Sequence, residues 1–213
     1  MKYKHLIFDF DGVLAETNEI RFECFRLLFA DYPHDQVQKL VEYAKLNGGI
    51  SRYEKIKYFF TAIRDEPITE VDVRVLAKRY SELVKDKVIS AKPVEGSIEF
   101  LSCYYNKYDF AIISGSDQEE LREVCQIRKI DHYFDEILGS PVSKESNINS
   151  LMEETEWDNK LCLYIGDSIN DLNAARTNNI SFVGRRSGLV DWSATDNVDA
   201  INDISQLQFY LNS

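Results

Sequence analysis

The stretch Leu6-Ile7-Phe8-Asp9-Phe10-Asp11-Gly12-Val13 decides the fold, because a short apolar run ends there in two acids and a glycine. A continuous apolar run bounded by a turn signal predicts a buried strand of a parallel sheet. Later runs have the same character at 110–113, 161–165 and 180–183, and a weaker one lies at 134–138. The chain therefore predicts several buried parallel strands.

Helical patterns separate the later strands. They occur at 95–106, 117–127, 146–156 and 170–178. Strands that alternate with helices favour an α/β fold, in which a doubly wound parallel sheet carries helices on both faces.

The segment 16–87 breaks this alternation and has a helical pattern throughout. Within it, Ile56, Phe59, Phe60 and Ile63 recur with the spacing of one helical face. We therefore predict a helical cap domain at 16–87, inserted into a core domain made of 1–15 and 88–213.

Asp9 and Asp11 directly follow the first predicted strand, and ligands of open α/β sheets bind at this end of the strands. In extended backbone, residues two apart point to the same side. Two carboxylates that converge need a proton or a cation, and Mg²⁺ prefers oxygen ligands. A turn with solvated acids is the simpler interpretation of this pair taken alone.

The second polar cluster follows strand 110–113. The Ser114 hydroxyl and neighbouring backbone N–H groups, such as that of Gly115, could hold phosphate oxygens. Ser116 and Glu119 have the spacing of a helix capping box, which explains part of the cluster without any ligand. Further along, Lys144 stands beside a helix start, where it is either a surface residue or the positive partner of a phosphate.

Asp167 and Asp171 follow strand 161–165, four residues apart across a strand-to-helix turn. Both could reach one metal ion, or Ser168 with Asp171 could form a helix cap. A cap leaves the acid at Asp167 unexplained.

Taken together, these residues resemble the haloacid dehalogenase superfamily of phosphatases. The likeness runs through the whole chain, in the order DFDGV, IISGS, an isolated Lys144 and GDSIND. The helical insertion is similar to the type-one cap of the phosphoglycolate phosphatase and phosphoglucomutase branch.

The resemblance implies a role for each core residue. Asp9 would be the nucleophile and Asp11 the general acid and base. Ser114, Gly115 and Lys144 would bind phosphate. Mg²⁺ would be held by Asp9, Asp167 and the main-chain carbonyl of Asp11, and Asp171 would either support the metal or orient Lys144.

In the cap, Gly48-Gly49-Ile50-Ser51-Arg52-Tyr53-Glu54 is similar to a Gly-x-Ser-Arg segment that contacts substrate in the phosphoglucomutase branch. Ser51 and Glu54 also have the spacing of a capping box, which does not need Arg52. Arg21 stands where the mutase branch carries a histidine, so it disfavours a mutase and is a second candidate anion contact.

The activity predicted from these residues is hydrolysis of a small phosphomonoester, such as a sugar phosphate. The alternatives are a phosphomutase, an inactive binding domain and a receiver domain. A phosphonatase would need a cap lysine for Schiff-base chemistry, and the sequence offers no clear candidate for it.

The charge balance restricts the possible partners. There are 25 Lys and Arg against 36 Asp and Glu, for a net charge of −11, and such a surface repels nucleic acid and anionic lipid. No apolar run is long enough to span a membrane. The four cysteines form no CxxC pair, which favours a reducing, cytoplasmic location. The oligomeric state is not predicted.

Overall fold

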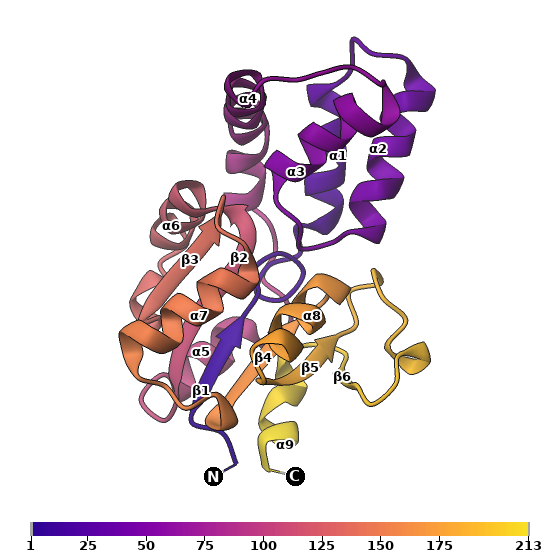
Figure 1. Ribbon diagram of the computed structural model, residues 1–213. Helices are drawn as coiled ribbons and strands as arrows, with labels where there is room; N and C mark the ends of the chain where they lie inside the picture. Colours follow the sequence, from indigo (N-terminus) through magenta and orange to yellow (C-terminus); the bar gives the residue numbers. More distant parts are fainter. Residues whose placement is uncertain (1, 213) are drawn as a thin grey trace.

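The computed structural model describes residues 2–212, and at its centre lies a six-stranded sheet in which all strands are parallel (Figure 1). The strand order is β3-β2-β1-β4-β5-β6. The strands are β1 (His5–Phe8), β2 (Asp109–Asp117), β3 (Glu136–Ser140), β4 (Cys162–Gly166), β5 (Ser181–Arg185) and β6 (Asp199–Ile201). The predicted α/β fold with a parallel sheet is confirmed.

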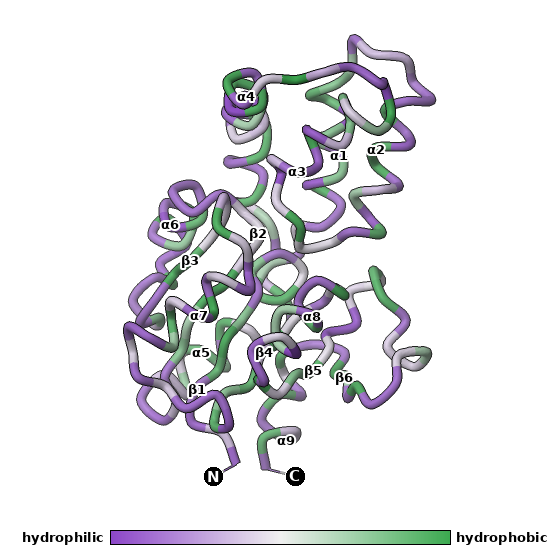
Figure 2. Tube along the Cα trace, in the orientation of Figure 1, coloured by the Kyte–Doolittle hydropathy of each residue, from purple (hydrophilic) through white to green (hydrophobic). Residues whose placement is uncertain are grey.

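The first strand is central because its apolar residues are covered on both faces. Leu6, Ile7 and Phe8 are inaccessible to solvent, and β1 pairs with both β2 and β4. Leu6 and Phe8 belong to one core and Ile7 to the other, as side chains alternate along a strand. Figure 2 shows hydrophobic segments along the central strands.

Helices cover both faces of the sheet. On the Ile7 face pack α7 (Lys144–Thr155) and α8 (Ile169–Thr177). On the opposite face pack α5 (Ser97–Tyr104), α6 (Gln118–Ile127) and α9 (Leu207–Asn212). Each helix supplies an apolar stripe to one side of the sheet, which is the arrangement that two buried faces require.

A separate lobe of helices stands above the carboxyl ends of the strands (Figure 1). It contains α1 (Asn18–Leu28), α2 (His34–Leu46), α3 (Arg52–Tyr58) with a π-helical turn at Phe59–Ile63, and α4 (Glu70–Ile89). Aromatic contacts hold the lobe together, among them Phe29 against Phe59 at 4.2 Å between ring centroids. The division into a core of 1–15 and 88–213 and a cap of 16–87 stays a prediction.

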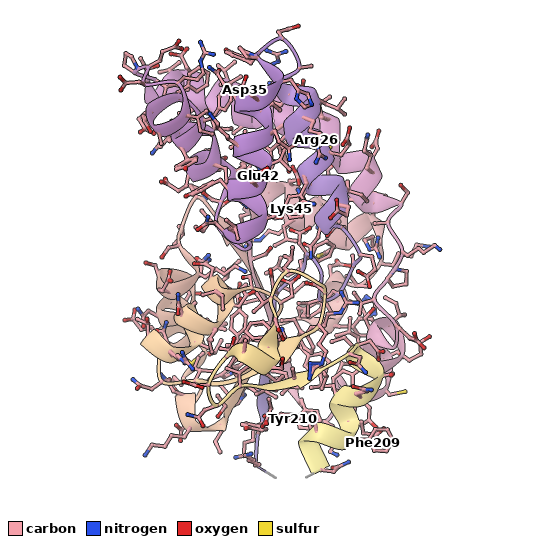
Figure 3. All side chains as sticks on the ribbon, turned by 90° about the vertical axis from the view of Figure 1, so that its right-hand side faces the viewer. Arg26, Asp35, Glu42, Lys45, Phe209 and Tyr210 are labelled. Carbon is pink, nitrogen blue, oxygen red and sulfur yellow. The ribbon has the colours of Figure 1, made fainter. Side chains whose placement is uncertain are left out.

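The outer side of this lobe is polar. Figure 3 looks onto its α1 and α2 side, where Arg26, Asp35, Glu42 and Lys45 lie at the surface. The buried side of α1, in contrast, carries Phe22, Phe25 and Leu28.

Two strands differ from the sequence expectation. The weak run at 134–138 becomes β3, which begins at Glu136, and β6 was not predicted. Asp199-Ala200-Ile201 contains too few apolar residues to be recognised, because a short edge strand buries little surface. Three of the four cysteines, Cys24, Cys125 and Cys162, are buried, and all four are free thiols.

Candidate active site

Three neighbouring strands bring the predicted core residues to one place. Asp9 follows β1, Ser114 lies within the last residues of β2, and Asp167 follows β4. β1 lies between β2 and β4, so the three side chains meet at the carboxyl edge of the sheet. All three are buried and line one cavity.

Asp9 and Lys144 form a buried ion pair at the centre of this site. Lys144 Nζ lies 3.0 Å from Asp9 Oδ2 and also contacts Asp171 Oδ1. The Phe10 N–H donates to Asp9 Oδ1 at 2.7 Å. Burial alone disfavours the Lys144 ammonium, but Asp171 and Asp9 raise its pKa above the usual value. Lys144 is therefore charged and points at the candidate nucleophile, and it is not a surface residue.

An excess of negative charge surrounds this lysine. Asp9, Asp167 and Asp171 each offer a carboxylate oxygen, and these oxygens lie within 4.8 Å of one another. Desolvation, together with the neighbouring acids, raises the pKa of Asp9 to about 8 and that of Asp167 to about 7. Three acids against one ammonium fit a hard divalent cation such as Mg²⁺, which would restore the anionic forms.

Asp171 is engaged with protein groups on both oxygens. Oδ1 accepts from Lys144 and lies 3.2 Å from the Tyr164 hydroxyl. Oδ2 accepts from the Ser168 N–H at 3.0 Å and from its hydroxyl at 2.7 Å, which completes a capping box at the start of α8. Of the two roles expected for Asp171, the contacts favour the orientation of Lys144.

The phosphate-binding candidates lie where β2 becomes irregular. Its register against β3 shifts between Ile113 and Asp117, and such a bulge redirects side chains. Ser114 is almost fully buried. A Cβ on Gly115 would lie 2.2 Å from the Gly49 carbonyl oxygen, so only glycine lets the cap loop pass this closely.

The expected capping box of Ser116 and Glu119 is wrong. Asp117 caps α6 by accepting from the Glu120 N–H. The Ser116 hydroxyl instead donates to Asp11 Oδ2 at 2.6 Å. The Ser116 side chain thus contacts the site, and the Asp117 side chain caps the helix.

Asp11 also has partners from the start of the cap segment. Its Oδ1 accepts from Thr17 at 2.5 Å and from Arg21 Nε at 2.9 Å. Burial by itself favours the neutral acid, but Arg21 and the hydrogen bonds from Ser116 and Thr17 lower the pKa of Asp11. Asp11 is therefore ionised in this arrangement.

The two predicted cap arginines meet a core residue that the sequence did not reveal. Arg52 donates to both oxygens of Glu120, at 2.6 and 2.8 Å, and Arg21 donates to Oε1 at 2.8 Å. The Arg52 guanidinium also stacks over the Tyr80 ring at 4.8 Å. Although burial disfavours the Glu120 anion, these arginines lower its pKa to about 2.

Glu120 belongs to core helix α6, so this cluster joins cap and core. The glutamate follows another acid in a first helical turn, where acids are common, and no local pattern marks it. Arg21 and Arg52 line the cavity. Their contact with substrate stays a prediction, since their charge is already matched by Glu120 and Asp11.

The cap loop lies close against the core at the cavity. Gly49 has a φ of +78°, and a Cβ there would lie 2.7 Å from Ser168 Oγ and 3.2 Å from Lys144 Nζ. The space left between cap and core is about 50 Å³. One water needs about 10–15 Å³ of such volume, so the closed site holds only a small group.

Sequence reasoning did not assign several of the residues that form the site to it: Thr17, Asn18, Lys55, Ser116 and Glu120. Asn18 Nδ2 donates to Asp167 Oδ2 at 2.7 Å, which holds this carboxylate toward Asp9. Asn18 is the first residue of α1, and an asparagine there is also explained as a helix-start residue. Only its proximity to Asp167 distinguishes the two roles.

A family model described as haloacid dehalogenase-like hydrolase matches residues 6–185. The match begins in β1 and ends in β5, and it includes the cap helices and the candidate core residues. The chain therefore belongs to this family of hydrolases, and the resemblance expected from its sequence is confirmed. A comparison with curated proteins finds no significant match.

Solved structures resemble the chain over its whole length. A haloacid dehalogenase-like hydrolase from Bacteroides fragilis is 21% identical, with a TM-score of 0.77 over 97% of this chain and 100% of that chain. A predicted phosphatase from Clostridium acetobutylicum is 19% identical, with a TM-score of 0.80 over 100% of this chain and 99% of that chain. Mutant CbbY from Rhodobacter sphaeroides, in complex with xylulose-(1,5)bisphosphate, is 15% identical, with a TM-score of 0.78 over 96% of each chain. At these identities the likeness shows the fold alone.

Among the helices of residues 2–212, none combines the length and the apolar character needed to cross a bilayer. The expected cytoplasmic location stays a prediction.

Proposed function

We propose that this hydrolase is a Mg²⁺-dependent phosphatase that cleaves a small phosphomonoester through a phosphorylated Asp9. The observation that carries this proposal is the buried pair of Asp9 and Lys144, 3.0 Å apart at the carboxyl end of the central strand. Phosphoryl transfer depends mainly on positioning and on neutralisation of the phosphoryl charge. A buried carboxylate with an ammonium beside it meets both needs.

The reaction follows from the residues around Asp9. A carboxylate oxygen of Asp9 bonds to phosphorus as the ester P–O bond breaks, and protonated Asp11 gives its proton to the leaving oxygen. Water then attacks the phosphorus of the aspartyl phosphate. Asp11 takes a proton from this water, and inorganic phosphate leaves as the Asp9 carboxylate is restored. In the ligand-free arrangement Arg21 keeps Asp11 ionised, so Asp11 takes up a proton from solvent as the substrate binds and releases it after the second step.

The other core residues hold the phosphoryl group and the metal. The Ser114 hydroxyl, the Gly115 N–H and Lys144 would bind the phosphoryl oxygens. Asp9, Asp167 and the main-chain carbonyl of Asp11 would hold Mg²⁺, with Asp171 behind Lys144. When bound, Mg²⁺ supplies positive charge next to the phosphoryl oxygens.

A small substrate suits the narrow cavity between cap and core. About 50 Å³ between cap and core leaves no room for a large leaving group unless the cap opens further. CbbY, which shares the fold, is described in complex with a phosphorylated sugar. These two observations support a sugar phosphate or a metabolite of similar size as the substrate.

The proposal is tested by phosphate release from a panel of phosphorylated metabolites, with Mg²⁺ and with EDTA. We expect steady release that requires Mg²⁺, and no turnover by Asp9→Asn, because an amide is a far weaker nucleophile than a carboxylate. Normal turnover by Asp9→Asn would contradict the nucleophile assignment. In the same samples, ³¹P NMR would reveal a mutase if two phosphate esters interconverted without release of phosphate.

A further inference from the structure

The first turn of α3 presents two cations to the cavity, and they differ in their surroundings. Arg52, Lys55 and Ile56 are the buried residues of this helix, and their spacing places them on one face. Arg52 is held by Glu120. Lys55 is only 8% exposed and lines the same cavity as Asp9, yet no side-chain hydrogen bond or ion pair joins its Nζ to any residue of 2–212.

The acids around the cavity do not form an ion pair with Lys55, because each of them already has another partner. Asp11 is paired with Arg21, and Glu120 with both arginines. Asp9 and Asp171 share Lys144. Asp167 accepts from Asn18 and belongs to the candidate metal site.

A buried ammonium without a partner is costly, because desolvation is not compensated. This desolvation lowers the pKa of Lys55 to about 8, so the amine still carries its charge at neutral pH. The cap residues Phe22, Phe25 and Tyr80 line the same cavity with rings, so part of its wall is apolar. An anion from outside the chain would compensate the desolvation of this ammonium.

The position of Lys55 indicates which part of a ligand it meets. It stands on the cap, whereas Ser114, Gly115 and Lys144 belong to the core and already serve the phosphoryl group. Lys55 and Asp11 line the same cavity, and the Asp11 carboxylate is the neighbouring charge that most favours the charged form of Lys55. Asp11 is the proposed acid for the leaving oxygen, so Lys55 lies on the side where the leaving group departs.

We propose that Lys55 recognises a second anionic group, a carboxylate or a second phosphate, on the leaving part of the substrate. The substrate class is then a short phosphomonoester with two anionic ends. This inference rests on the proposed phosphatase function for the orientation of the ligand. It assigns substrate selection to Lys55 rather than to Arg52, whose charge is matched by Glu120.

The test measures binding as well as turnover, so that the two proposals can fail separately. Phosphonopropionate and propylphosphonate differ in a carboxylate at the far end and are not phosphate esters. By calorimetry with Mg²⁺, we expect the wild type to bind phosphonopropionate at least about tenfold more tightly, as a charge-assisted hydrogen bond predicts. Lys55→Met should abolish this difference, and Lys55→Gln provides a second neutral variant of similar size.

Turnover is compared with matched esters. Phosphoglycerate and glycerophosphate differ in a carboxylate, and propanediol bisphosphate and propanediol monophosphate differ in a phosphate. The pair with the larger wild-type ratio of kcat/KM identifies the anion, and Lys55→Met should reduce that ratio toward one. Lys57→Met is the control, because Lys57 lies on the same helix with Glu54 and Glu70 as its partners.

The outcomes separate the two proposals. If the binding difference is absent in the wild type, or survives in folded Lys55→Met and Lys55→Gln, the assignment of Lys55 is overturned. If the difference depends on Lys55 but no ester is hydrolysed, the anion site stands and the phosphatase proposal fails.

Discussion

The cavity has a core wall, formed by residues at the carboxyl ends of the strands, and a cap wall, formed by residues of the helical lobe. The two walls position their residues in different ways. On the core wall, Asp9, Ser114 and Asp167 lie at the ends of three adjacent strands, so the sheet itself positions them. On the cap wall, Arg52 depends on Glu120, a residue 68 positions away in the other lobe. Residues that the sheet positions are suited to a reaction step that many substrates share. Residues positioned at the junction of the two lobes are suited to selecting the substrate and to closing the cap. Substitutions on each wall test this difference.

The largest effect is expected on the core wall. Asp167→Asn removes a candidate ligand of Mg²⁺ and should lower kcat/KM by about a thousandfold or more on every substrate, because charge at the transition state is left uncompensated. It should also raise the Mg²⁺ concentration required. The measurement is phosphate release over a Mg²⁺ titration, with exposed Asp86→Asn as the control. A wild-type Mg²⁺ requirement in Asp167→Asn would remove this residue from the metal site.

The pH dependence of Mg²⁺ binding provides a second measurement on the same site. Without the ion, Asp9 and Asp167 have pKa values of about 8 and about 7, whereas in the unfolded chain both carboxyls lose their protons near the ordinary pKa of 3.8. Folding then takes up protons, so the stability of the metal-free protein falls as pH rises through this window. Protons and Mg²⁺ compete, so Mg²⁺ should raise Tm more at pH ~8.5 than at pH ~6. Equal shifts at both pH values would contradict the metal site.

An intermediate effect is expected at Asp11, which links the two walls through Ser116 and Arg21. Asp11→Asn removes the acid and should lower kcat/KM for a sugar phosphate by about 10²–10⁴-fold. p-Nitrophenyl phosphate has a good leaving group and needs less acid assistance, so its loss should be smaller. Equal losses on both substrates would argue against the role of Asp11 as acid.

The smallest effect is expected at the junction. Glu120→Gln leaves Arg21 and Arg52 without their shared anion, so the closed position of the cap loses charged hydrogen bonds. We expect kcat/KM to fall by about tenfold, mainly through KM, since such a bond contributes about 1.5–3 kcal/mol. Hydrogen exchange in the loop 48–51 should become faster.

The neighbouring glutamate provides the control for this experiment. Glu119 is exposed on the same helical turn, and Glu119→Gln should change neither KM nor the exchange rate. If Glu120→Gln behaved in the same way, the ion cluster would not hold the cap closed.

The sequence by itself predicted the parallel sheet, apart from its short edge strand β6, and the carboxylates of the core wall. Apolar runs predict buried strands, and polar residues directly after such runs must meet at one edge when the strands are parallel and adjacent. Asp9 and Asp167 became candidates in this way, whereas the role of Lys144 was predicted only from the resemblance to the family. The exposed-lysine interpretation of Lys144 and the Ser116 capping box were settled only by the contacts.

Tertiary structure alone decided the cap wall. Glu120, Lys55 and Ser116 sit in local patterns that predict ordinary helix surfaces, starts or caps, and nothing in those patterns says which residues of the other lobe they approach. Arg52 and Lys55 lie on the same helical turn and are both positively charged. Of the two, only Arg52 forms an ion pair with a carboxylate. Periodicity determines which residues of a segment face inward, whereas the charge they meet there depends on how two lobes distant in sequence pack together.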